Sequence, residues 1–157
     1  MISILVTGGA GFIGSHTCLL LLERGHNVFV IDSFINSSSK SLDQVLIFLE
    51  KRNIFARDRL HLFKGDILQE KDIEKVFKNS FEINKPIESV MHFAGLKSIS
   101  ESYQKPLKYW ETNVFGTIKL LKIMEKYNCK NIVFSSSATV YKSKSKSLFF
   151  EDDTCEP

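Results

Sequence analysis

The stretch Thr7–Gly14, TGGAGFIG, follows a short apolar run, Ile2–Val6, and precedes apolar residues that recur at helical spacing up to Gly25. This order predicts a strand, a glycine turn and a helix. Gly25 stands where the end of a helix favours a left-handed residue. The next apolar run, Val28–Ile31, is typical of a strand buried on both faces. Strand, helix and strand within about 30 residues form one βαβ unit.

The alternation of helix and strand continues along the chain. Apolar periodicity predicts helices at 42–52, 70–79 and 106–127, and strands at 60–63, 89–93 and 132–135. Five short strands alternating with helices predict an α/β fold with a doubly wound parallel sheet of the Rossmann type. One apolar stripe is expected on the last helix, formed by Leu107, Trp110, Val114, Ile118, Leu121 and Met124.

The composition is that of an ordinary globular protein. With 157 residues, 43% of them hydrophobic and 25% charged, the chain can bury one core, which excludes a disordered tail or a disulfide-stapled miniprotein. The net charge of +3 is spread along the chain, so nucleic acid is not an expected partner. No apolar run approaches about 20 residues and no signal segment opens the chain, so no membrane is expected.

Cysteine and histidine spacing gives no metal site. Cys18, Cys129 and Cys155 are an odd number at long spacings, which suits neither a disulfide framework nor a metal clamp. A reducing, cytoplasmic location is the simplest expectation. His92 resembles a buried strand-end histidine more than a catalyst, and no second histidine stands at ligand spacing, so no metal is assigned.

The glycine turn has the spacing of a dinucleotide-binding loop. Gly9–Gly14 fits Gly-x-Gly-x-x-Gly, and Gly8 adds a second, overlapping spacing. Gly8 or Gly9 permits the tight turn, and Gly11 lets the backbone approach a pyrophosphate. Gly14 lets the helix pack closely on the strand, and the N-terminus of the helix offers free N–H groups to the anion.

An acidic residue, Asp32, ends the second predicted strand. There its carboxylate can accept a hydrogen bond from a ribose 2′-hydroxyl and repel a 2′-phosphate, which favours NAD over NADP. The simpler alternative is that Asp32 caps the next loop and the glycines only shape a turn. The third and fourth strands end in Gly65–Ile67 and His92–Gly95, which in this fold would line the adenine and nicotinamide sides of a cofactor.

Several segments resemble the extended short-chain dehydrogenase/reductases and, within them, the UDP-glucose 4-epimerase family. The resemblance covers nearly the whole chain. Its generic parts are the glycine turn, Gly65-Asp66 and the region of Asn113. Its more specific parts are Gly14–Thr17 (GSHT), His92–Lys97 (HFAGLK), Glu101-Ser102 with Pro106-Leu107, and Phe134–Tyr141 (FSSSATVY).

The resemblance implies a role for individual residues. NAD is the implied cofactor and a UDP-sugar the implied substrate, with Ser137 as the catalytic serine and Lys97, Ser137 and Thr139 at the sugar side. A structural alternative for the serine run 135–137 is a strand-end turn that uses its hydroxyls locally. The implied cofactor-binding residues are Gly8, Gly11, Phe12, Ile13, Gly14, Asp32, Asn36, Ser37, Asp66, Ile67, Phe93, Ala94, Gly95, Lys97, Asn113 and Ser135.

The family interconverts UDP-glucose and UDP-galactose through a 4-keto sugar. A base takes the proton of the sugar 4-hydroxyl while hydride passes to NAD, and the hydride returns to the other face. The base is a tyrosine followed four residues later by a lysine, and no tyrosine of this chain has that lysine. In the family this pair follows an acidic stretch like Glu151–Pro157.

We therefore expect residues 1–141 to be an incomplete NAD-binding domain and 142–157 a loop leading to the absent catalytic pair. The chain would be the N-terminal part of an epimerase, truncated before the sixth strand and inactive alone, and a homodimer when full length. A non-catalytic nucleotide-binding remnant and an epimerase of another UDP-sugar stay open. Related 4,6-dehydratases carry an acidic residue soon after the serine run, where this chain has Ser137–Val140 (SATV). Lys142 departs from the glycine usual in the family.

Overall fold

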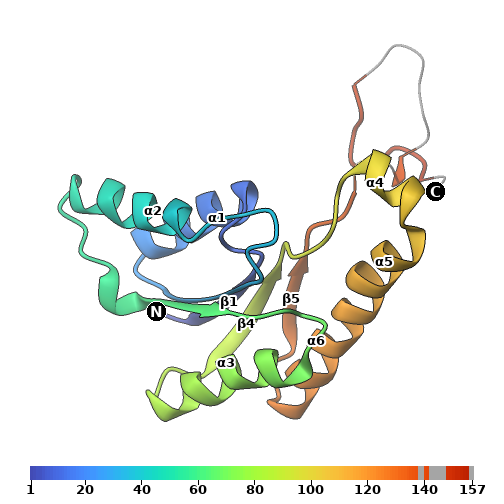
Figure 1. The fold of residues 1–157 in the computed structure, drawn as a ribbon. Coiled ribbons are helices and arrows are strands. Elements are labelled where there is room, and N and C mark those ends of the chain that lie inside the picture. Colours follow the sequence, from blue (N-terminus) through green and yellow to red (C-terminus); the bar gives the residue numbers. More distant parts are fainter. Residues whose placement is uncertain (138–139, 142–147, 156–157) are drawn as a thin grey trace.

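The computed structural model describes residues 1–137, 140–141 and 148–155, which form a five-stranded sheet flanked by helices (Figure 1). The strand order is β3-β2-β1-β4-β5, and every adjacent pair is parallel. This confirms the predicted doubly wound fold. The strands are β1 (Ser3–Thr7), β2 (Asn27–Asp32), β3 (Leu60–Lys64), β4 (Ile87–His92) and β5 (Asn131–Phe134).

Two layers of helices cover the sheet. The helices α1 (Phe12–Glu23) and α2 (Lys40–Glu50) lie on one face, whereas α3 (Glu70–Glu82) and α6 (Gly116–Lys126) lie on the other (Figure 1). Because successive side chains of a strand point to opposite faces, Leu5 packs in the α3–α6 core and Val6 in the α1–α2 core. The shorter helices are η1 (Arg57–Arg59), α4 (Ile99–Gln104), α5 (Pro106–Trp110) and the π-helical turn η2 (Glu111–Phe115).

The sheet changes winding direction between its two central strands. From β1 the chain proceeds outward through β2 to β3, then returns to the other side of β1 with β4 and β5. Such a switch point leaves a crevice beyond the carboxyl ends of the strands, where ligands bind in doubly wound sheets. The outer strand β5 is exposed along its length, in contrast to β1 and β2, which are buried throughout.

The expected single helix at 106–127 differs from the structure in two respects. The structure divides it into α5, the turn η2 and α6, and the predicted apolar stripe lies on its exposed side. Leu107 is 82% exposed and Trp110 64%, and only Met124 of the six is buried. The buried face uses Gly116, Leu120 and Ile123 instead. Apolar residues occur on two sides of this segment, and periodicity alone cannot tell which side meets the sheet.

Helix α4 is a second difference, because the sequence patterns predicted no helix there. It is only six residues long and buries none of them, so it has no apolar period to detect. Its beginning is fixed locally instead. The Ser98 hydroxyl accepts a hydrogen bond from the Glu101 N–H at 3.3 Å, which is an N-cap contact.

Candidate functional site

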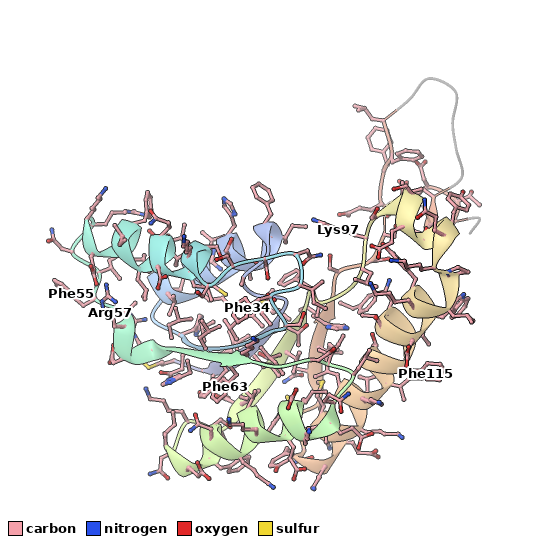
Figure 2. All side chains as sticks on the ribbon, in the orientation of Figure 1. Phe34, Phe55, Arg57, Phe63, Lys97 and Phe115 are labelled. Carbon is pink, nitrogen blue, oxygen red and sulfur yellow. The ribbon has the colours of Figure 1, made fainter. Side chains whose placement is uncertain are left out.

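A cleft of about 880 Å³ opens beyond the carboxyl ends of the strands. This volume is within the usual range for small-molecule sites. Its lining comes from the glycine turn, the loops after β2, β3 and β4, the serines after β5, and parts of α4, α5 and η2. Figure 2 shows Lys97 on the segment between β4 and α4, beside this cleft.

Most residues assigned to a ligand from the sequence line this one cleft. Ser37 does not line it, and Thr139 lies outside the described residues. The lining includes Gly8, Gly11, Phe12, Ile13, Gly14, Asp32, Asn36, Asp66, Ile67, Phe93, Ala94, Gly95, Lys97, Asn113, Ser135 and Ser137. The structure thus places together residues that are up to 129 positions apart, from Gly8 to Ser137.

The glycines of the turn differ in how much space a Cβ would have. Gly8 has φ of +67°, and a Cβ there would lie 2.7 Å from the Ala94 nitrogen. At Gly14 a Cβ would collide with the carbonyl oxygen of Gly8, so this glycine allows α1 to pack on the turn. Gly11 is less restricted, since its Cβ would make one tight contact, with the Gly8 oxygen at 3.3 Å, and no overlap.

The N-terminus of α1 faces the cleft without a side-chain cap from the described residues. Gly11 is the N-cap residue, and Phe12 and Ile13 of the first turn line the cleft. The first N–H groups of a helix have no partner within the helix and carry its positive dipole end. This arrangement can bind a phosphate group, as helix N-termini after glycine turns commonly do.

The buried carboxylate of Asp32 joins the glycine turn to the loop after β2. It accepts hydrogen bonds from Ala10 N–H at 2.9 Å, Phe34 N–H at 2.9 Å and the Ser37 hydroxyl at 2.8 Å. A carboxylate has about four acceptor positions, so one remains for a ligand hydroxyl. The capping role raised as the simpler alternative is therefore present, and it is compatible with ribose binding.

The loop after β3 is held by α6. Ile67 is buried against Gly116, where a Cβ would lie 2.7 Å from the Ile67 Cδ1. The Lys119 ammonium donates to the carbonyl of Leu68 at 2.7 Å. Within the loop, the Asp66 carboxylate accepts the Leu68 N–H at 2.9 Å. These contacts fix one wall of the cleft on the β3 side.

The loop after β4 is held by the π-helical turn. Asn113 accepts the Leu96 N–H at 2.8 Å and donates its side-chain amide to the Leu96 carbonyl at 2.9 Å. A π turn adds a residue to the helical repeat, and such turns are frequent at functional sites. Sequence periodicity does not detect this turn, although the resemblance already placed Asn113 among the implied cofactor-binding residues.

His92 is a buried, hydrogen-bonded histidine at the end of β4. Its Nδ1 lies 2.5 Å from the Thr7 hydroxyl and its Nε2 lies 3.0 Å from the Thr117 hydroxyl. Burial lowers the pKa of His92 to about 4, so the ring is neutral near pH 7. This agrees with the interpretation of His92 as a strand-end histidine rather than a catalyst.

The serine run follows β5 into the cleft. Ser135 N–H donates to the His92 carbonyl at 3.2 Å, which extends the β4–β5 pairing by one residue. Ser135, Ser136 and Ser137 all line the cleft. The Val140 N–H donates to the Ser137 carbonyl at 3.3 Å, which is a local turn contact of the kind considered as the structural alternative.

Sequence reasoning missed the polar group between α4 and α5. The Tyr109 hydroxyl accepts the Ser98 N–H at 3.1 Å and donates to the Glu101 carboxylate at 3.3 Å. The Lys108 ammonium, 3.1 Å from Glu101, holds the pKa of that carboxyl below its usual range. Ser98, Lys108 and Tyr109 line the cleft. The sequence signals were the Glu101-Ser102 and Pro106-Leu107 segments of the resemblance, and Pro106 begins α5 and so sets the position of Tyr109.

Over residues 1–137, 140–141 and 148–155, no group of three or more His, Cys, Asp or Glu side chains is arranged to hold a metal ion. In the same part of the chain, no helix has the length and apolar character needed to cross a bilayer.

The fold and the cleft together define a doubly wound α/β protein with a candidate ligand site at the switch point of its sheet. A protein-family model described as GDP-mannose 4,6 dehydratase matches residues 5–157. The chain belongs to this family.

Individual relatives are UDP-glucose 4-epimerases. The chain is 46% identical to UDP-glucose 4-epimerase 2 of Arabidopsis thaliana over 139 residues, which are 88% of this chain and 37% of that protein. It is 48% identical to the UDP-glucose 4-epimerase of Yersinia enterocolitica over 139 residues, 88% of this chain and 38% of that protein. The chain thus spans less than half the length of these curated relatives.

A solved structure shares the architecture. The UDP-glucose 4-epimerase of Bifidobacterium longum, crystallised with NAD+ and UDP, superposes with a TM-score of 0.82 at 37% identity. The match covers 98% of this chain and 42% of that one. The similarity therefore extends over both halves of the sheet described above.

Proposed function

We propose that this chain is the NAD-binding part of a UDP-glucose 4-epimerase. The observation that carries the proposal is the convergence of Gly11, Asp32 and Asn113 on one cleft at the switch point of the sheet. Gly11 is the N-cap residue of α1, and the Asp32 carboxylate has an acceptor position that its three hydrogen bonds leave unused. The relatives at 46% and 48% identity and the epimerase structure with NAD+ and UDP support the same assignment.

The residues of the cleft fit the parts of a dinucleotide. The N-terminus of α1 suits the pyrophosphate, and Asp32 suits the hydroxyls of the adenosine ribose. The loop around Asp66 and Ile67 would flank the adenine, and the segment Phe93–Lys97 would lie along the nicotinamide half. Bound NAD would supply the hydride acceptor of the reaction.

The sugar end of the site is proposed at the serines after β5. Ser137 would hydrogen-bond the reacting 4-oxygen of a UDP-sugar, and Lys97 and Thr139 would lie on the sugar side. The general base of the family is absent because no tyrosine here is followed four residues later by lysine. We therefore expect this chain to hold and orient ligands without deprotonating the sugar.

A 4,6-dehydratase is the second candidate, since the matching family model carries that description. The stretch Ser137–Val140 lacks the acidic residue that would assist loss of water, which favours the epimerase. A non-catalytic nucleotide-binding protein is the third. The three differ in products, so the reaction of a complete protein carrying this segment with UDP-glucose distinguishes UDP-galactose, a dehydrated 4-keto sugar and no product.

Calorimetric titration of the chain with NAD tests the part of the proposal that concerns this chain. We expect saturable one-to-one binding of NAD, and weaker binding of NADP because Asp32 would repel its 2′-phosphate. Incubation with UDP-galactose should give no UDP-glucose. Equal affinity for the two dinucleotides, or turnover by the chain alone, contradicts the proposal.

We also propose that the complete protein is a homodimer formed through α5 and α6. Both helices expose an apolar stripe that includes Leu107, Trp110, Ile118 and Leu121. Contiguous exposed apolar surface on a soluble protein commonly marks an interface. Sedimentation analysis should show self-association that Leu121→Glu reduces, whereas a monomer at all concentrations contradicts this proposal.

A further inference from the structure

A series of side-chain hydrogen bonds passes through His92 at the base of the cleft. The ring connects the hydroxyl of Thr7, on β1, with the hydroxyl of Thr117, on α6. It is 2% exposed, and the ring of Phe134 on β5 flanks it at 5.5 Å between centroids. These three contacting groups are uncharged. His92 is therefore a neutral bridge between two elements that pack on either side of it.

The bonds beyond the ring determine the direction of each hydrogen bond. The Thr117 hydroxyl donates its only proton to the Asn113 carbonyl at 2.7 Å, so its oxygen accepts from His92 Nε2–H. In a neutral imidazole the other nitrogen, Nδ1, is then an acceptor. The Thr7 hydroxyl must donate to it. The geometry therefore specifies the Nε2–H tautomer.

The two ends of this series hold the segment between β4 and α4. The Thr7 oxygen, with its proton directed to His92, accepts the Ala94 N–H at 3.2 Å. At the other end, Thr117 binds the carbonyl of Asn113, whose side chain holds Leu96 by both backbone groups. Thus Thr7 binds the backbone of Ala94, and Asn113 binds the backbone of Leu96. His92 connects these two contacts through its hydrogen bonds to Thr7 and Thr117.

We propose that His92 is a positioning residue that, as the neutral Nε2–H imidazole, fixes the segment Phe93–Lys97 against the cleft. It touches no ligand in this role and acts through Thr7 and Thr117. The inference rests on the proposed function for the statement that this segment contacts NAD. In the reversed tautomer Nε2 would be a lone pair that needs a proton from Thr117, and Thr117 could supply it only by giving up its hydrogen bond to the Asn113 carbonyl.

The tautomer can be measured on the unaltered chain. Long-range ¹H–¹⁵N correlation spectra of the histidine side chains distinguish protonated from unprotonated ring nitrogens, and the contact with Phe134 assigns the His92 ring. At neutral pH we expect a protonated Nε2 and an unprotonated Nδ1. A protonated Nδ1 overturns the proposal, and this measurement requires neither a variant nor a ligand.

Variants of Thr117 test whether the bridge positions the segment. Thr117→Val removes the hydroxyl at nearly constant volume, and Thr117→Ser retains it as the matched control. In the valine variant we expect amide hydrogen exchange at Leu96 to quicken by about tenfold and the NAD dissociation constant to rise by about tenfold. The serine variant should stay within about twofold of the parent in both.

The outcomes separate positioning from a merely structural role. If Thr117→Val lowers the melting temperature but leaves both the Leu96 exchange relative to the core amides and the NAD affinity of the folded protein unchanged, the proposal is wrong. If the parent chain does not bind NAD, the proposed function fails. The tautomer and the exchange comparison still decide the role of His92 in that case.

Discussion

Asn113 holds Leu96 by both of its backbone polar groups, at 2.8 Å and 2.9 Å, across the boundary between the π-helical turn and the loop after β4. The two residues are 17 positions apart in sequence. A side-chain amide can do this because it carries a donor and an acceptor together. Gly95 lies against the same amide, where a Cβ would come within 3.2 Å of the Asn113 Oδ1. The contact therefore fixes both the position and the orientation of the loop after β4.

Replacing Asn113 by Asp should damage this contact selectively. The carboxylate can still accept the Leu96 N–H, but it places a second acceptor against the Leu96 carbonyl. A lost hydrogen bond with an unpaired partner costs about 1–3 kcal/mol, and we expect NAD affinity to fall by about tenfold. Titration calorimetry measures the change. Glu125→Gln, an exposed exchange of the same groups on α6, should bind like the parent, and an unaltered affinity in Asn113→Asp contradicts the prediction.

Two glycines of the same turn should respond differently to alanine. Gly14→Ala places a Cβ against the Gly8 carbonyl and 2.7 Å from the Gly9 Cα, and both are backbone atoms that cannot rotate away. We expect it to destabilise the fold by about 1–3 kcal/mol. Gly11→Ala makes one tight contact, at 3.3 Å from the Gly8 oxygen, and has an ordinary extended backbone, so it should destabilise the fold less than Gly14→Ala does.

The same pair separates folding from ligand binding. The Cβ of Gly11→Ala would occupy space beside the N-terminus of α1, so NAD affinity should fall although the denaturation midpoint decreases less than in Gly14→Ala. Chemical denaturation and NAD titration on both variants provide the comparison. Equal loss of stability in the two variants would show that the turn, rather than the ligand, requires Gly11.

Much of this architecture followed from sequence pattern, and the failures have physical causes. The buried strands β1 and β2 are continuous apolar runs, and the glycine turn between β1 and α1 has a fixed spacing. These features are local, so the sequence predicts them directly. The exposed stripe at Leu107 and Trp110 was misplaced because solvent-facing and core-facing apolar residues have the same helical period.

The parts of the site that were missed depend on contacts distant in sequence. Thr7 and Thr117 meet His92 only after β1, β4 and α6 have packed together. Tyr109 contacts Ser98 only because α4 is present, and α4 has no buried face from which to predict it. In contrast, Asp32 could be placed because it ends a recognisable strand.

Asp32→Asn should weaken both the turn and the cofactor site. The carboxylate accepts three hydrogen bonds, and an amide in its place turns one acceptor into a donor facing an N–H group or the Ser37 hydroxyl. We expect a stability loss of about 1–3 kcal/mol and a smaller preference for NAD over NADP. Asp43→Asn in the first turn of α2 is the control for loss of one charge. An unchanged ratio of NAD to NADP affinity in Asp32→Asn would restrict this residue to the capping role.

Acid should destabilise the protein partly through His92. Burial lowers its folded-state pKa from 6.5 to about 4, so the unfolded chain binds more protons between these values. Stability from this group is complete above about pH 6.5 and declines as the pH falls toward 4, by ~3 kcal/mol in all. Glu74, whose pKa the ammonium groups of Lys126 and Lys78 lower to about 2, loses its contribution only below about pH 4.5.

Denaturation at a series of pH values can therefore isolate the histidine. His92→Phe keeps a ring at this position without a titrating group, so its stability should change less than that of the parent between pH 6.5 and 4, whatever its absolute stability. His61, whose pKa burial also lowers, contributes in the same direction in both proteins and cancels from the comparison. Parallel curves for the parent and His92→Phe would mean that His92 is protonated in the folded state as readily as in the unfolded chain.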